Sequence, residues 1–303
     1  MPRFADHLLD LARRLSAEHL LGSRRAAMAA ALLLFGTASL AGVSNLPEID
    51  GGVRWGLLVL AGATLVSLGT ALNAAEFALS AKLLGHTVGV AIAFRTALIA
   101  GAFNLLPFPG AAVVRTQTLY GLGSNYPKAL GATLVASFGT LGTALAFTGA
   151  ILWANPAART AAVALLGCGA LLLAALYVAA RRETESRLVA TRLALGLILI
   201  GTASIAVKAL RVYLVIVALR QPVTSTQAAV IALLWVLTLF AGFFPGGLGI
   251  RELLAAGVSP LVGLHPSVGV TTSAVDRLMG VAVLWILTLL FLRSAPSIPR
   301  VKA

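Results

Sequence analysis

Charged residues are scarce in this chain: aspartate, glutamate, lysine and arginine make up 11% of its 303 residues. Soluble domains carry about 25% charged residues, since these cover much of the surface that faces water. Hydrophobic residues make up 59% of the chain, which is too much apolar sequence for a soluble packing arrangement to hide. We therefore predict an integral membrane protein, with lipid as the solvent around most of the chain.

Cysteine and catalytic motifs are almost absent as well. Cys168 is the only cysteine, so no intramolecular disulfide can form. The four histidines are scattered, and the sequence contains no HExxH, Walker A or GxSxG pattern. We therefore expect no metal and no cofactor, and these absences argue against an enzyme of a familiar hydrolase, kinase or dinucleotide-binding class. A membrane enzyme whose catalytic residues lie on separate helices stays open as an alternative.

Negative charge is the scarcer sign, and the formal net charge is +13. The basic residues stand in short clusters between apolar runs, which is typical of the positive-inside rule rather than of a nucleic-acid partner. Residues 1–24 combine arginines with apolar residues at helical spacing, which predicts a cytoplasmic amphipathic segment on the membrane surface. A partly ordered tail is the alternative for this segment.

Long apolar runs are abundant, and six of them reach the roughly 20 residues that a membrane crossing needs. They cover residues 26–46, 55–81, 129–153, 160–180, 193–219 and 267–292. Two pairs of shorter apolar segments, 90–106 with 111–122 and 226–244 with 252–263, are each separated by a proline–glycine break. We predict an all-α, polytopic helical bundle.

The two breaks are related in sequence. Arg115 follows Pro109 by six residues, and Arg251 follows Pro245 by six. The order span, span, broken segment, span occurs twice, and a proline, Pro127 or Pro266, is predicted to open the last long helix each time. The predicted regions are an N-terminal segment (1–24), a first membrane repeat (25–158), a second membrane repeat (159–293) and a cytoplasmic tail (294–303).

Charge then predicts the topology. If each broken segment is a re-entrant hairpin, each repeat has three spans, and the second repeat is inverted relative to the first. With a cytoplasmic N-terminus, the acidic loop Glu48–Asp50 falls outside, whereas the Arg181–Arg192 loop and the tail fall inside. Four spans per repeat would move that basic loop outside, and five would need the short segments to cross. We predict a multi-pass protein of the inner, cytoplasmic membrane with both termini in the cytoplasm.

The breaks also predict a binding site. Lipid cannot satisfy the backbone groups that a break frees at membrane depth, so a break must face protein or a polar cavity. The helix that follows begins with exposed N–H groups that attract anions. Arg115 and Arg251 stand at these positions, and we predict that they bind the phosphate of a lipid headgroup. The alternative is that both arginines extend to the membrane interface and fix helix depth.

Further charged residues accompany these arginines. Glu252 is predicted to pair with an arginine such as Arg277, to accept a proton or to recognise a cationic headgroup; a stabilising charge at a helix N-terminus is the alternative. Asp276 and Arg277 are costly in a membrane, so we expect them to face the interior of the bundle; a position at the membrane interface is the alternative for Asp276.

Three charged residues lie on corresponding helices of the two repeats. They are Glu76 in the first repeat, and Lys208 and Arg211 in the second. We predict that Glu76 pairs with Lys208 or Arg211 within the membrane, as a structural rather than a catalytic pair.

The second break closely resembles the signature of the membrane region of the lysylphosphatidylglycerol synthase family. The residues that carry this resemblance are Phe-Pro245-Gly246-Gly247-Leu-Gly249-Ile-Arg251-Glu252. Asn104-Leu-Leu-Pro107 with Gly110 and Arg115 resembles the first-half motif of that family, and Asp276-Arg277 is similar to its late arginine. The chain departs from the pattern at Ala111 and Ala112, where the family usually has an acidic residue after the glycine, and this weakens the first-half site.

The resemblance spans residues 50–293 and implies a stand-alone, flippase-like membrane region without the soluble aminoacyl-transfer domain of that family. It implies lipid transport: translocation or binding of an anionic phospholipid or lipid-linked headgroup in a cavity between the repeats. A membrane enzyme, or an accessory subunit that docks a lipid-modifying enzyme partner, stays open as an alternative. We expect Gly246, Gly247 and Gly249 to permit close backbone approach and positive φ.

Overall fold

The computed structural model describes residues 44, 52–103, 110–154, 156, 159–237 and 250–294, and within them the protein is helical, without strands. Five helices are long and apolar enough to cross a membrane: Trp55–Leu83, Tyr126–Trp153, Arg159–Glu183, Arg187–Ala218 and Pro266–Phe291. The predicted all-α fold is confirmed, and these five helices are compatible with the predicted membrane bundle. The predicted N-terminal segment 1–24, the predicted span 26–46 except Ser44, and residues 295–303 of the tail lie outside the described residues.

The elements follow one another with short connections. They are α3 (Trp55–Ala61), a π-helical turn (Gly62–Val66), α4 (Ser67–Leu83), α5 (Val90–Phe103), α6 (Gly110–Gly121), α7 (Tyr126–Trp153), α8 (Arg159–Glu183), α9 (Arg187–Ala218), α10 (Ser225–Leu237), α11 (Ile250–Val258), a 3-10 turn (Ser259–Val262) and α12 (Pro266–Ser294). α3, the π-helical turn and α4 form one continuous helix, Trp55–Leu83, which contains Glu76.

Local sequence explains where the last long helix of each half begins. The side chain of Asn125 accepts a hydrogen bond from the backbone N–H of Lys128 at 3.0 Å, and Pro127 lies in the first turn of α7. Asparagine satisfies an orphan N–H at this position, and proline has no N–H to leave unpaired. α12 begins at Pro266. Both helix starts were predicted from the prolines and are confirmed.

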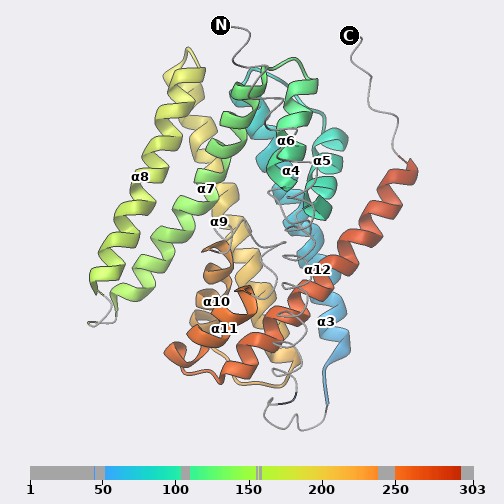
Figure 1. Cartoon of the computed structure of the whole chain (residues 1–303), viewed down its shortest axis with the longest axis vertical. Helices are drawn as coiled ribbons and strands as arrows, with labels where there is room; N and C mark the ends of the chain where they lie inside the picture. The colour runs from blue at the N-terminus through green and yellow to red at the C-terminus, as the bar shows by residue number, and fades with distance from the viewer. Residues whose placement is uncertain are drawn as a thin grey trace, which may run out of the picture.

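The short helices occupy opposite ends of the bundle. α5 and α6 lie in the upper half of Figure 1, and α10 and α11 lie in the lower half. α4 runs upward and α9 downward, while α7 runs downward and α12 rises obliquely across the bundle. The turn between α8 and α9 lies at the upper end with the turns that flank the α5–α6 pair.

Each pair of short helices starts and ends on the same side of the molecule. At the upper end, Nε2 of His86, before α5, lies 2.7 Å from Oγ of Ser124, after α6. At the lower end, Nε2 of Gln227, in the first turn of α10, donates to the backbone oxygen of Val262 at 2.7 Å. The α5–α6 pair and the α10–α11 pair therefore both return to the end from which they depart.

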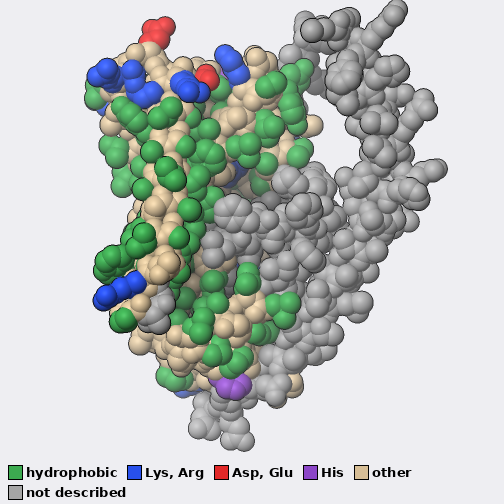
Figure 2. All heavy atoms as spheres, turned by 60° about the vertical axis from the view of Figure 1, so that its left-hand side comes forward, with side chains coloured by type: hydrophobic (Ala, Val, Ile, Leu, Met, Phe, Trp, Pro, Cys, Tyr) green, Lys and Arg blue, Asp and Glu red, His purple; other side chains and the backbone are tan. Residues whose placement is uncertain are grey.

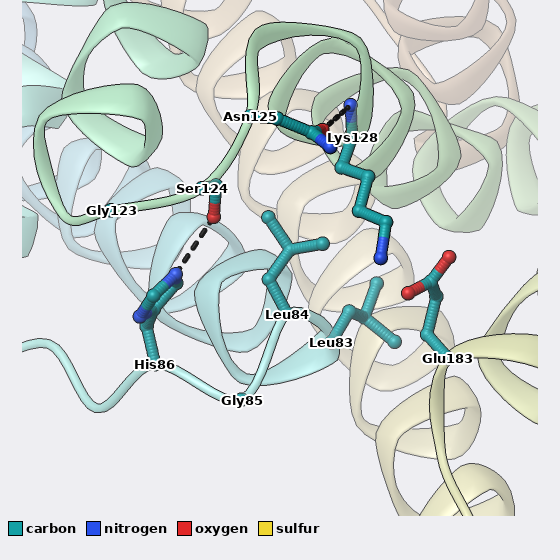
Figure 3. Close-up of a pocket in the computed structure, with 9 residues that line it drawn as sticks. All are labelled: Leu83, Leu84, Gly85, His86, Gly123, Ser124, Asn125, Lys128 and Glu183. Atoms are coloured by element: carbon teal, nitrogen blue, oxygen red, sulfur yellow. Dashed lines mark hydrogen bonds between the residues drawn. The ribbon is translucent and has the colours of Figure 1, made fainter.

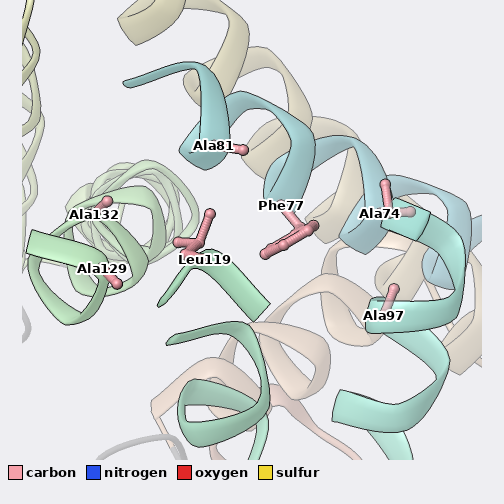
Figure 4. Close-up of a cluster of buried hydrophobic side chains, with 8 residues drawn as sticks. Ala74, Phe77, Ala81, Ala97, Leu119, Ala129 and Ala132 are labelled. Atoms are coloured by element: carbon pink, nitrogen blue, oxygen red, sulfur yellow. The ribbon is translucent and has the colours of Figure 1, made fainter. Parts of the chain in front are cut away.

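Small residues bring the helices of the first half together. Phe77 from α4 and Leu119 from α6 are fully buried side by side, and Figure 4 shows them ringed by alanines from α4, α5 and α7. These alanines are Ala74, Ala81, Ala97, Ala129 and Ala132. Because lipid supplies no hydrophobic force between helices, close backbone approach between small residues is a common way for membrane helices to associate.

Glycines allow the closest crossings. A Cβ on Gly201 of α9 would lie 2.8 Å from Cα of Thr140 on α7, and a Cβ on Gly169 of α8 would lie 2.8 Å from the backbone oxygen of Gly142 on α7. On the face drawn in Figure 2, most lysines and arginines gather at the upper end and one basic group lies toward the lower end, with mainly hydrophobic and uncharged groups between them.

Candidate functional site

Glu76 on α4 binds side chains of two other helices of the first half. Its Oε1 lies 2.6 Å from Nη1 of Arg115 on α6, and its Oε2 accepts a hydrogen bond from the hydroxyl of Thr140 on α7 at 3.2 Å. Glu76 is 6% exposed and Arg115 is 9% exposed. A buried carboxylate needs such partners, because an isolated charge is very costly away from water.

The predicted pairing of Glu76 with Lys208 or Arg211 is therefore wrong. α6 packs against α4, since Leu119 and Phe77 share one core cluster, and Leu119 lies one turn after Arg115 on α6. This packing directs the guanidinium of Arg115 to Glu76. Arg211 is held elsewhere, by a carboxylate of α12.

Asp276 is the corresponding centre of the second half. Arg211 on α9 binds both of its oxygens, through Nε to Oδ1 and through Nη2 to Oδ2, the latter at 3.1 Å. Arg251 on α11 donates from Nη2 to Oδ2 at 2.5 Å. The side chain of Asp276 is 1% exposed, and each of the two arginines is 15% exposed. One carboxylate thus serves two guanidinium groups from different helices.

Glu252 and Arg277 form a third buried contact. Nε of Arg277 on α12 lies 3.3 Å from Oε1 of Glu252 on α11, and the hydroxyl of Ser273 donates to the same oxygen at 3.1 Å. Glu252 is fully buried. The predicted pairing of Glu252 with Arg277 is confirmed, and so is the interior position of Asp276 and Arg277.

Lys208 is a further cation on α9. It lies on α9, one turn before Arg211, and its side chain is half-buried. In the part of the chain that the structure describes, its ammonium forms neither an ion pair nor a hydrogen bond with a carboxylate. Glu76 and Asp276 both lie within its electrostatic range, as do Arg211 and Arg251.

The eight charged residues described above form what we call the ionic cluster. Its members are Glu76, Arg115, Lys208, Arg211, Arg251, Glu252, Asp276 and Arg277. Five carry positive charge and three carry negative charge, so the cluster has an excess of two positive charges. Within the described ranges, no group of three His, Cys, Asp or Glu side chains is placed to hold a metal ion.

Most residues of the two break motifs lie outside the described residues. Gly110 is described: it begins α6 and is buried. The motif residues that lie outside the described ranges are Asn104, Pro107, Pro109, Pro245, Gly246, Gly247 and Gly249. Their predicted roles in ending helices and in letting backbones approach stay predictions.

Sequence reasoning missed a polar pocket at the upper end of the bundle. This cavity of about 560 Å³ is lined by the α4–α5 turn with His86, the α6–α7 turn with Ser124, and the end of α8. Figure 3 shows Lys128 and Glu183 extending toward each other at its side. The residues are distant in sequence, and no spacing rule connects them. The hydroxyls of Thr140 and Ser273 were missed for a similar reason, since such residues are common in membrane helices.

No family model matches the chain, and neither a curated protein nor a solved structure matches it.

Proposed function

We propose that this protein handles lipids within the bilayer, by translocating or binding a phospholipid or lipid-linked headgroup at the ionic cluster. The observation that carries the proposal is the group of largely buried ion pairs that join arginines of α6, α9, α11 and α12 to carboxylates of α4, α11 and α12. Ionisable residues in membrane segments are rare, and they mark substrate or ion pathways. The anion that a bilayer itself supplies is the phosphate of a lipid headgroup.

An inverted-repeat architecture would suit this activity. The α5–α6 pair returns to the upper end and the α10–α11 pair to the lower end, which supports two re-entrant hairpins that enter from opposite faces (Figure 1). α4 and α9 run in opposite directions, as do α7 and α12, which is what inversion requires. Secondary transporters repeatedly place their substrate between such halves.

The upper end is the proposed cytoplasmic side. In the described residues it carries exposed Lys82, Lys128, Arg182, Arg187 and Arg192, whereas the opposite end carries exposed Arg54, Arg159 and Arg220. The larger number of cations favours the cytoplasmic assignment for the upper end. The inner membrane is the proposed location.

The motif of the second break supports a flippase-like activity through its resemblance to the membrane region of the lysylphosphatidylglycerol synthase family. A membrane enzyme has less support, because Glu252 and Asp276, the buried carboxylates of the second half, are both bound by arginines.

The test is lipid movement in liposomes that contain the purified protein and a fluorescent anionic lipid. A quencher added outside reports how quickly labelled lipid reaches the outer leaflet. We expect faster movement than in protein-free liposomes, and slower movement with Asp276→Asn than with the matched control Glu185→Gln, which removes an exposed carboxylate in the turn between α8 and α9. A protein that neither moves nor binds labelled lipid, while a scramblase in the same assay does, overturns the proposal.

A further inference from the structure

We propose that the polar pocket at the upper end of the bundle binds a headgroup that carries a phosphate and a primary ammonium, as phosphatidylethanolamine does. In this assignment Lys128 holds the phosphate and Glu183 holds the ammonium. The described residues that line this cavity of about 560 Å³ are all distinct from the ionic cluster. The pocket is therefore a second site, and its occupation does not depend on lipid movement through the bundle.

The pocket lies at the level of a membrane where headgroups are found. Three of the helices that are long and apolar enough to cross a membrane meet there: one ends at Leu83, one begins at Tyr126 and one ends at Glu183. A span crosses the hydrocarbon, so its ends reach the headgroup layer. Tyr120 and Tyr126, at the end of α6 and the start of α7, are exposed, and tyrosines gather at this level of a bilayer.

Two opposite charges face each other at the side of the pocket. Figure 3 shows the ammonium of Lys128, near the start of α7, and the carboxylate of Glu183, the last residue of α8, extending toward each other. Among the described residues these two side chains do not form an ion pair with each other. A ligand with an anion and a cation a few bonds apart suits this arrangement, whereas an ion of one sign meets one of the two side chains as a like charge.

The helix ends give the pocket the same polarity as these side chains. α7 begins at the pocket, and the positive end of its macrodipole favours an anion beside Lys128. α8 ends there, and the negative end of its macrodipole favours a cation beside Glu183. The side chain of Asn125 caps α7 on the backbone N–H of Lys128 at 3.0 Å, which fixes the start of this helix. The phosphate therefore lies toward α7 and the ammonium toward α8.

The remaining wall of the pocket suits the uncharged part of such a headgroup. Leu83 and Leu84 present apolar groups to it (Figure 3). The contact of 2.7 Å between Nε2 of His86 and Oγ of Ser124 ties the α4–α5 turn to the α6–α7 turn, so the wall keeps its shape without a ligand. Sites for small ligands commonly have volumes of roughly 300–1,000 Å³, and this cavity has room for a headgroup together with water.

The carboxylate distinguishes one zwitterionic headgroup from another. A primary ammonium donates hydrogen bonds to Glu183, whereas the quaternary ammonium of phosphatidylcholine has no N–H to donate. Phosphatidylglycerol brings a phosphate without any ammonium and leaves Glu183 beside an anion. Because Lys128 and Glu183 are both exposed, each contact is worth no more than a surface ion pair, which amounts to a preference of about fivefold.

The experiment measures equilibrium binding of radiolabelled short-chain phosphatidylethanolamine to the full chain in detergent micelles. Phosphatidylcholine and phosphatidylglycerol with the same acyl chains are the competitors. We expect phosphatidylethanolamine to bind about fivefold more tightly than either competitor. Glu183→Gln should reduce its affinity to that of phosphatidylcholine. Lys128→Gln should weaken both zwitterionic lipids alike, by about fivefold, because it removes the partner of the phosphate that they share.

The matched controls are Glu185→Gln and Lys82→Gln. Each removes an exposed charge of the same sign at the same end of the bundle, from a side chain that does not line the pocket. Both should bind phosphatidylethanolamine as the parent protein does. The ionic cluster is unchanged in all four variants, so a difference between a variant and its control reports on the pocket.

The outcomes separate the pocket from the proposed function. Equal affinities for the three lipids, or a preference for phosphatidylethanolamine that Glu183→Gln leaves intact, overturn the inference and leave the proposed function standing. Absence of lipid movement in liposomes, with this preference intact, overturns the proposed function alone. Phosphoethanolamine without acyl chains distinguishes the source: if it competes as strongly as the short-chain lipid, the site for a phosphate and an ammonium stands and the lipid source is overturned.

Discussion

Glu76 and Asp276 show how single carboxylates organise the interior of this protein. Each is almost fully buried and each binds an arginine from a short helix, Arg115 for Glu76 and Arg251 for Asp276. In the first half the second partner is a hydroxyl, and in the second half it is a further arginine, Arg211. The halves therefore share a plan in which a long-helix carboxylate binds the short-helix arginine, but they differ in net charge.

The sequence predicts which charged residues lie inside, because a charge in an apolar run is tolerated only when it faces protein. Asp276 and Arg277 were expected to face the interior of the bundle, and both are buried. The sequence does not predict which residue each buried charge pairs with. The pairing of Glu76 depends on how α6 is rotated against α4, and neither hydropathy nor spacing carries that information.

Replacement of Glu76 by glutamine tests the contact in the first half. The change leaves Arg115 buried without its counter-charge, and removal of one partner of a buried ion pair costs about 3–5 kcal/mol. We expect a clearly lower unfolding temperature in detergent micelles. The exposed Glu183→Gln is the matched control and should shift stability by less than about 0.5 kcal/mol.

The double variant Glu76→Gln with Arg115→Met should recover part of this loss, since it removes the uncompensated charge as well as its partner. Unfolding of Glu76→Gln at the same temperature as Glu183→Gln would contradict the assignment of this contact.

Whole helices were predicted more reliably than their contacts. The apolar run 129–153 corresponds to α7 (Tyr126–Trp153), and the run 160–180 corresponds to α8 (Arg159–Glu183). Length and hydropathy suffice there, because a crossing needs about 20 apolar residues. The crossing points of these helices depend instead on which glycines face a neighbour, and the chain has 30 glycines. Sequence periodicity alone does not distinguish the glycines at contacts from those facing lipid.

Gly201→Ala tests the crossing of α9 with α7. The added Cβ would lie 2.8 Å from Cα of Thr140 and 2.9 Å from the backbone oxygen of Gly139, so the two helices must move apart. Such overpacking costs about 1–3 kcal/mol. The displacement would also loosen the hydrogen bond of Thr140 to Glu76. We expect a lower unfolding temperature in detergent.

Gly131→Ala on α7 is the matched control, because nothing lies within 4 Å of its added Cβ. Alanine is a better helix former than glycine, so this variant should be stabilised by about 0.5–1 kcal/mol. Shifts of the same sign and size in both variants would show that the crossing is not as tight as the structure describes.

At the scale of the whole molecule, the two ends differ in charge and receive different pairs of short helices. The predicted inversion of the second repeat came from counting spans and from the positions of the basic clusters. The opposite placement of the α5–α6 and α10–α11 pairs supports it (Figure 1). The breaks themselves, residues 104–109 and 238–249, lie outside the described residues, so labelling from each side of the membrane is the direct test.

Single cysteines placed after a Cys168→Ala replacement test this topology. Thr87 and Lys128 flank the α5–α6 pair, Arg220 and His265 flank the α10–α11 pair, and all four are exposed. In sealed inside-out and right-side-out vesicles, we expect a membrane-impermeant thiol reagent to label positions 87 and 128 only from the cytoplasmic side, and positions 220 and 265 only from the other side. The reason is that each pair returns to its own end, through the His86–Ser124 contact above and the Gln227–Val262 contact below. Labelling of the two members of a pair from opposite faces would contradict the hairpins, whereas labelling of all four from one face would contradict the inversion.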